Sequence, residues 1–135
     1  MAKISKKYKP TQKEKFMNAK MKEYFKQKLL NWKNELLKES NQTLSNLQSD
    51  NEAKPDITDR ASEEIDRSFE LRTRDRERKL INKINAALQR IEDSSYGYCE
   101  ETGEPIGLKR LEARPVATLS LEAQEMHEKA EKRLN

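Results

Sequence analysis

Apolar residues recur along the first half of the chain at the alternating spacing of four and three residues that is typical of a coiled coil. Starting after Met21, the stripe consists of Phe25, Leu29, Trp32, Leu36, Thr43 and Leu47. No glycine or proline interrupts this segment before Ser49. The pattern predicts a long helix from Met21 that buries one narrow face against a partner.

A polar segment at 49–61 ends this stripe and contains Pro55, which favours a turn. A second helical pattern starts near Thr58 or Asp59, either of which can cap a helix, and continues to about Asp93. The charged stretch 72–79 interrupts its apolar positions, and the stems of these charged side chains can cover the apolar face. Those apolar positions are Ala61, Ile65, Phe69, Leu80, Ile84, Leu88 and Ile91. Two helices of similar length joined by a short turn predict an antiparallel hairpin with its tip at 49–61.

The amino-acid composition changes after Asp93. All three glycines lie between Gly97 and Gly107, which predicts a small turn-rich globular region. A final helix is predicted from Ser120, as N-cap, to Leu134. The predicted fold class is therefore all-α, or mainly so, in three parts: a Lys-rich N-terminal arm at 1–20, an antiparallel coiled coil at 21–93, and a globular region with a C-terminal helix at 94–135.

Composition narrows the class of protein. Of the 135 residues 39% are charged and only 33% hydrophobic, which suits a helical hairpin better than a large core. No run of about 18 apolar residues is present, and one cysteine permits no internal disulfide, so we expect a soluble cytoplasmic protein without membrane contact. Residues 1–33 carry eleven lysines against two glutamates. This arm either meets an anionic partner or is a solvated tail, and the sequence leaves both open.

The globular region contains half of a zinc-ribbon pattern. A structural zinc site needs four thiolate or imidazole ligands in two closely spaced pairs. Here the corresponding positions are Cys99 and Thr102, then Ser120 and Ala123. A hydroxyl is a poor substitute for a thiolate and a methyl group cannot bind, so the sequence predicts no metal. His127 is the only histidine, and the chain shows no catalytic triad or phosphate-binding glycine loop, so we expect no enzyme.

Charged groups elsewhere offer two candidate binding sites. Asp56 and Asp59 lie three residues apart at the predicted tip, where they either cap a helix or bind Mg²⁺ or the basic groups of a partner. The segment 72–83 has six basic residues against two acids, and it and Arg114 either meet phosphate or form a solvated face.

These segments together resemble a known family. "DRASEEIDRSFELRTRDRERKLINKI" followed by "EDSSYGYCEETGEPIGLKRLEARPVA" is similar to the DksA/TraR family of bacterial transcription factors, from about Met21 to the end of the chain. The resemblance implies a monomer that binds RNA polymerase without sequence-specific DNA binding. It also implies that the coiled-coil tip enters the secondary channel and modulates initiation at ribosomal RNA and amino-acid promoters together with ppGpp.

The resemblance also assigns residues. The family's tip motif DxxDxA matches Asp56, Asp59 and Ala61, and its ppGpp contacts at the polymerase interface match Lys83 and Arg114. A third basic position is Gln124 here, which weakens the attraction for phosphate. With one cysteine at the four ligand positions, the chain resembles the zinc-independent members. Two other classes stay open: a transcript-cleavage factor of the GreA type, and a helical nucleic-acid-binding or adaptor protein that uses the Lys-rich arm.

Overall fold

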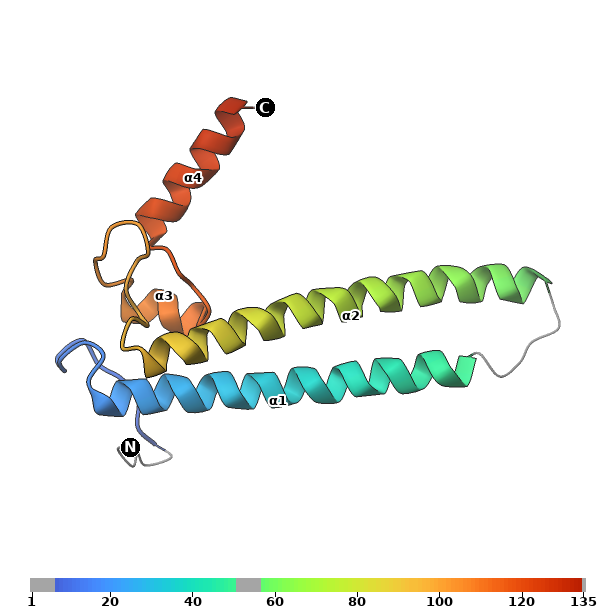
Figure 1. The fold of residues 1–135 in the computed structure, drawn as a ribbon, viewed down its shortest axis with the longest axis horizontal. Helices are drawn as coiled ribbons and strands as arrows, with labels where there is room; N and C mark the ends of the chain where they lie inside the picture. Colours follow the sequence, from blue (N-terminus) through green and yellow to red (C-terminus); the bar gives the residue numbers. More distant parts are fainter. Residues whose placement is uncertain (1–6, 51–56, 135) are drawn as a thin grey trace. The chain divides into compact units, whose positions relative to one another are not determined.

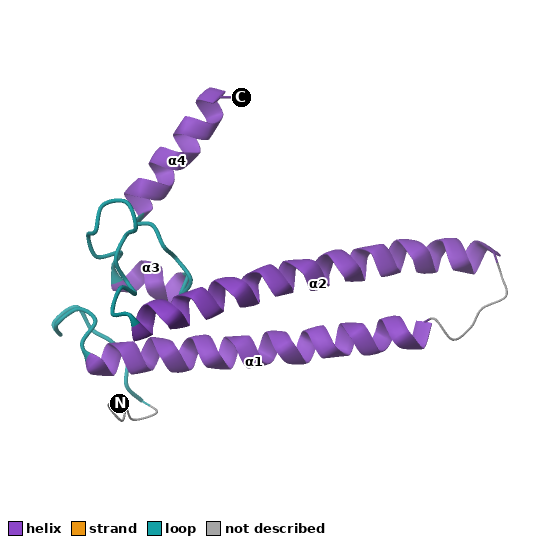
Figure 2. Cartoon of the chain, viewed as in Figure 1, coloured by secondary structure: helices purple, strands orange, loops and turns teal. Residues whose placement is uncertain are grey.

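Four helices form the framework of the part of the chain that the structure describes (Figure 1). The computed structural model describes residues 7–50 and 57–134, with side chains described except at 43–44, 46–50 and 57–60. The helices are α1 (Ala19–Asp50), α2 (Ile57–Glu92), α3 (Leu108–Ala113) and α4 (Leu121–Leu134). Within the described ranges no strand is present, and one isolated antiparallel bridge joins Tyr98 and Pro105 (Figure 2). No helix in these ranges is both long and apolar enough to cross a membrane.

The chain divides into two compact units. The first contains residues 1–30 and 84–135, and the second contains residues 31–83. The long helices α1 and α2 each contribute to both units, so every unit contains an antiparallel pair of helical segments.

Polar side chains fix where two of the helices begin. At α1, the Oδ1 atom of Asn18 accepts a hydrogen bond of 2.9 Å from the backbone N–H of Met21. At α4, the Oγ atom of Ser120 accepts one of 3.2 Å from the backbone N–H of Ala123, as predicted for an N-cap. Each bond satisfies a donor that the first turn of a helix leaves without an intrahelical partner.

Aromatic and aliphatic side chains from three segments form the core of the first unit. Phe25 is fully buried, and its ring lies 5.6 Å from that of Tyr96 and 5.2 Å from that of Tyr24. The hydroxyl of Tyr96 donates a buried hydrogen bond of 2.8 Å to the carbonyl oxygen of Pro115. Burial raises the pKa of Tyr96, so the phenol stays neutral and remains a donor. The largest fully buried side chains are Met21, Phe25, Leu29, Ile84, Tyr96 and Leu111.

The segment before α1 packs onto the turn-rich region of the same unit. Phe16 makes an edge-to-face contact with Tyr98, with ring centroids 5.5 Å apart. Gly97 has φ +90°, and a Cβ atom there would lie 3.1 Å from Met17. Glycine is therefore required at this position both by the backbone conformation and by the close approach of Met17.

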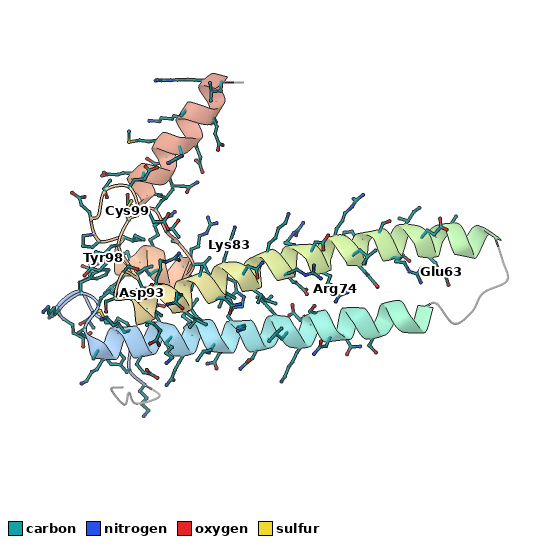
Figure 3. The ribbon with its side chains drawn as sticks, in the orientation of Figure 1. Glu63, Arg74, Lys83, Asp93, Tyr98 and Cys99 are labelled. Carbon is teal, nitrogen blue, oxygen red and sulfur yellow. The ribbon has the colours of Figure 1, made fainter. Side chains whose placement is uncertain are left out.

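The second unit corrects one prediction, the face of α2 that packs against α1. The partly or fully buried residues of α2 in this unit include Glu63, Arg67, Glu70, Arg74 and Glu77, at alternating spacings of four and three. Figure 3 shows Glu63 and Arg74 on the side of α2 that faces α1, and Lys83 on the other side. We call these five residues the charged seam.

The residues predicted to form this seam, Ala61, Ile65 and Phe69, are instead exposed. Ile65 is 71% and Phe69 69% exposed. Because Ile84 is fully buried and lies seven residues from Glu77, the heptad register of the helix brings positions 77, 70 and 63 to the buried face. The apolar residues at 61, 65 and 69 are out of phase with that register, so they point outward.

Two carboxylates of the charged seam are incompletely satisfied. One carboxylate oxygen of Glu70 and one of Glu77 are buried and have no hydrogen-bond partner among the described groups. Burial of an unpaired carboxylate oxygen has a desolvation cost that packing does not offset.

Candidate functional site

The predicted tip lies at the start of α2. Asp56 lies outside the described residues, and Asp59 falls in the first turn of α2, with its side chain also outside them. Ala61 follows on the same helix and is exposed. A helix N-terminus carries a partial positive charge that stabilises a nearby carboxylate. The helix start therefore suits acidic residues at this position, and a role in binding stays a prediction.

A tight turn surrounds Cys99 in the first unit. The backbone N–H of Cys99 donates a 2.8 Å hydrogen bond to the carbonyl oxygen of Glu104, and the N–H of Gly103 donates one of 2.8 Å to the carbonyl oxygen of Cys99. The N–H of Ile106 closes the turn with a 2.8 Å bond to Gly97. The glycine-containing segment predicted to be rich in turns thus forms a compact turn, and Cys99 is buried in it.

The four positions that correspond to zinc ligands, Cys99, Thr102, Ser120 and Ala123, lie at or next to this turn. The hydroxyl of Thr102 and the backbone N–H groups of Ser120 and Thr102 lower the pKa of Cys99 to about 6, because they stabilise the thiolate. Ser120 in turn caps α4 next to the buried Ala123. Among the described residues, no group of three His, Cys, Asp or Glu side chains could hold a metal ion.

The two basic residues assigned to ppGpp are both exposed. Lys83 is the last residue of the second unit, on α2, and Arg114 follows α3 in the first unit. Arg114 borders an open hollow of about 440 Å³ that Lys109 and Arg110 also line. Gln124, in place of a third basic residue, is half-buried and bonds to Glu128 on α4. Three cationic side chains thus line the hollow, and a role in binding phosphate stays a prediction.

No pattern in the sequence indicates the contacts made by α3. Glu112 on this short helix accepts hydrogen bonds from the hydroxyl of Tyr24, at 3.1 Å, and from the Nζ atom of Lys28, at 2.7 Å. Burial, and then the bond to Glu112, raise the pKa of Tyr24 to about 12. These contacts fasten α3, and with it Arg114, to the part of α1 in the same unit. Six residues are too few to show a helical period, which is why the sequence did not predict the helix.

His127 has a partner that its sequence context does not reveal. The Nε2 atom of His127, on α4, is in direct contact with the Oε1 atom of Glu101, on the turn around Cys99. This hydrogen bond, together with the negative charge of Glu101, raises the pKa of His127. The contact links α4 to the turn around Cys99.

The raised pKa of His127 leads to a testable prediction. Because the folded-state pKa exceeds the unfolded value of about 6.5, the pair contributes stability fully below that pH and loses it as the pH rises through the folded pKa. An NMR titration of this single histidine should give a pKa above the usual value, and Glu101→Gln should return it towards that value. Glu104→Gln, on the same turn, is the matched control and should leave it unchanged. An identical titration in Glu101→Gln would contradict the pairing.

Comparison with known proteins gives two family matches. Residues 21–91 match the model described as DnaK suppressor protein DksA, N-terminal domain. Residues 94–129 match the prokaryotic dksA/traR C4-type zinc finger.

Individual proteins agree with these matches. An RNA polymerase-binding transcription factor DksA from Caulobacter vibrioides is 65% identical over 125 residues, which are 93% of this chain and 88% of that protein. The protein of the same name from Escherichia coli is 43% identical over 121 residues, 90% of this chain and 80% of that one. The solved structure of transcription factor DksA2 from Pseudomonas aeruginosa aligns with a TM-score of 0.83 at 40% identity, covering 87% of this chain and 90% of that one. This agreement confirms the predicted mainly helical fold with its helical hairpin.

The zinc-finger match corrects the prediction that the chain has no zinc cofactor. The matched model is of the C4 type, which points to a zinc-binding domain at residues 94–129, so that prediction is contradicted. The donor set of this chain nevertheless differs from a four-cysteine site, because Cys99 is its single cysteine. Thr102, Ser120 and Ala123 offer two hydroxyls and a methyl group, which do not fit a closed tetrahedral zinc shell.

Proposed function

Because this chain belongs to the DksA family of transcription factors, we propose that it binds RNA polymerase and modulates transcription initiation by inserting its hairpin tip into the secondary channel. The observation that carries this proposal is the 65% identity, over 93% of the chain, to an RNA polymerase-binding transcription factor. The names of the relatives describe a transcription factor, and this chain is not an enzyme.

The proposed mechanism is the delivery of negative charge. Residues 57–83 of α2 in the second unit form a helix of roughly 40 Å at 1.5 Å per residue. Such a helix can carry Asp56 and Asp59 into a narrow channel. There, two carboxylates would attract the basic side chains or the Mg²⁺ of the polymerase active region and so destabilise a short-lived open complex.

The effector in this proposal is ppGpp, bound where the chain meets polymerase. Lys83 and Arg114 are exposed cations, and Lys109 and Arg110 add charge beside Arg114. Guanidinium and ammonium groups bind phosphate oxygens through charge-assisted hydrogen bonds. Because Gln124 is neutral, we expect ppGpp to strengthen regulation less than it would with three basic residues.

In vitro transcription from a ribosomal RNA promoter tests this proposal. With polymerase and the protein present, initiation should fall, and ppGpp should lower it further. The double variant Lys83→Ala/Arg114→Ala should lose about tenfold or more in sensitivity to ppGpp, because hydrogen bonds to charged groups contribute about 1.5–3 kcal/mol each. Its effect without ppGpp should persist. Lys79→Ala, which removes an exposed cation elsewhere on α2, is the control.

Two results would contradict the proposal. If the protein leaves initiation unchanged at saturating concentration, regulation of initiation is wrong. If it instead accelerates RNA cleavage in backtracked complexes, it acts as a transcript-cleavage factor of the GreA type.

We propose that it acts as a monomer, so sedimentation of the free chain should give the mass of one copy, 15.9 kDa.

A further inference from the structure

An apolar stripe lies on the outer face of α2 in the second unit and has no role in the charged seam. It consists of Ala61, Ile65 and Phe69, spaced four residues apart, so the three side chains share one face of the helix. Ile65 and Phe69 are among the most exposed large apolar residues of the described chain, at 71% and 69%. Since Glu63, Arg67 and Glu70 occupy the face towards α1, rotating the stripe inward would expose the heptad positions that continue from Ile84. The stripe is therefore available to a partner.

The stripe borders a shallow hollow of about 550 Å³. Its lining is Ala61, Glu64, Ile65, Ser68, Phe69 and Arg72. Glu64 and Arg72 lie eight residues apart, towards opposite ends of the apolar patch, and both are exposed. An apolar centre with one acid and one base at its edges specifies the orientation of a bound segment as well as its hydrophobicity.

We propose that this apolar stripe is a docking surface for RNA polymerase and takes an apolar segment that carries a basic group opposite Glu64 and an acidic group opposite Arg72. This inference rests on the proposed function and adds a binding role for α2 beyond its tip. Ala61 belongs both to the predicted tip motif and to the stripe, so the stripe begins at a residue of that motif. Phe69 is eight residues further on, a rise of about 12 Å along the helix. A channel that surrounds the tip therefore also reaches the stripe.

The size of the stripe favours polymerase over a second copy of this chain. Three side chains on two helical turns can bury at most about 500 Å², whereas each partner of a standard stable interface buries about 800 Å². Alone, the stripe is too small for a stable dimer. As part of an interface that already includes the tip, it supplies the apolar anchors that such interfaces need at their centre.

The experiment measures binding of the full-length protein to core RNA polymerase by competition against a fluorescent wild-type chain. The variant Ile65→Gln/Phe69→Gln keeps good helix formers and removes the apolar surface. It should bind about tenfold or more weakly, as expected for the loss of two anchor residues. At concentrations that saturate polymerase it should regulate initiation as the wild type does, because the tip is intact.

The matched control is Leu37→Gln, which removes an exposed apolar side chain from α1 in the same unit and should bind normally. A second measurement does not depend on the double variant being folded: Phe69→p-benzoylphenylalanine in the otherwise intact chain should crosslink to a large polymerase subunit on irradiation. Wild-type affinity of the double variant together with no crosslink overturns the inference. So does a concentration-dependent dimer that the double variant abolishes, since the stripe would then bind a second copy.

Failure of the proposed function gives a different result. If the wild-type chain does not bind polymerase, the proposed function is wrong, and the assignment of the stripe to polymerase is wrong with it. If Asp59→Asn regulates normally while the stripe variant binds weakly, the tip mechanism is wrong and the docking surface stands.

Discussion

Asp59→Asn should abolish the effect of the protein on initiation while leaving its affinity for polymerase nearly unchanged. Asn is close to Asp in size, and Asp59 lies within the first turn of α2 and not at its N-cap, so the start of α2 should persist. The substitution removes one negative charge. A charge pair about 4 Å apart contributes a few kcal/mol at the effective dielectric constant of about 20 that applies near protein surfaces. A loss of this size lowers the regulatory effect by well over tenfold, as measured by open-complex lifetime at saturating protein.

Asp66→Asn is the matched control for this prediction. Asp66 lies seven residues further along α2 and is exposed. Its substitution by Asn removes the same charge as Asp59→Asn does. It should leave both polymerase binding and open-complex lifetime unchanged. If Asp59→Asn weakened binding but regulated normally at saturation, the carboxylate would be an anchor and not the acting group.

Local features of the sequence predicted much of this fold. The long apolar stripe after Met21 predicted α1, and Ser120 caps α4 as expected. The turn predicted at Pro55 lies outside the described residues. Each of these signals depends on residues within a few positions of one another. Helix periodicity and capping are local properties, so a single sequence is enough to find them.

The predicted register of the first half of α2 was wrong for a physical reason. The charged stretch 72–79 separates two apolar runs. Because it contains no apolar residue, the sequence does not show whether the two runs lie on the same face of the helix. Ala61, Ile65 and Phe69 were therefore assigned to the same face as Ile84, although a helix is continuous and its register is set by the buried end. Counting heptads backwards from Ile84 would have predicted the buried positions 77, 70 and 63.

Contacts between distant parts of the chain could not be predicted at all. Glu112 bonds to Lys28 across 84 residues, and His127 pairs with Glu101 across 26. Neither pair has a sequence pattern, because each depends on how separate elements pack. The gathering of Cys99, Thr102, Ser120 and Ala123 was anticipated only through the spacing of a zinc pattern, and the lowered pKa of Cys99 required the hydrogen bonds themselves.

Phe25→Ala should lower the free energy of unfolding by about 3–5 kcal/mol, the range for removing a fully buried aromatic ring. Phe25 is 0% exposed and packs between Tyr24 and Tyr96, so its loss leaves a cavity in the core of the first unit. Phe69→Ala makes the same chemical change at an exposed site, and should cost no more than about 0.5 kcal/mol. Urea unfolding followed by circular dichroism measures both. Equal losses would mean that Phe69 packs against α1, and the outward register of the stripe would then be wrong.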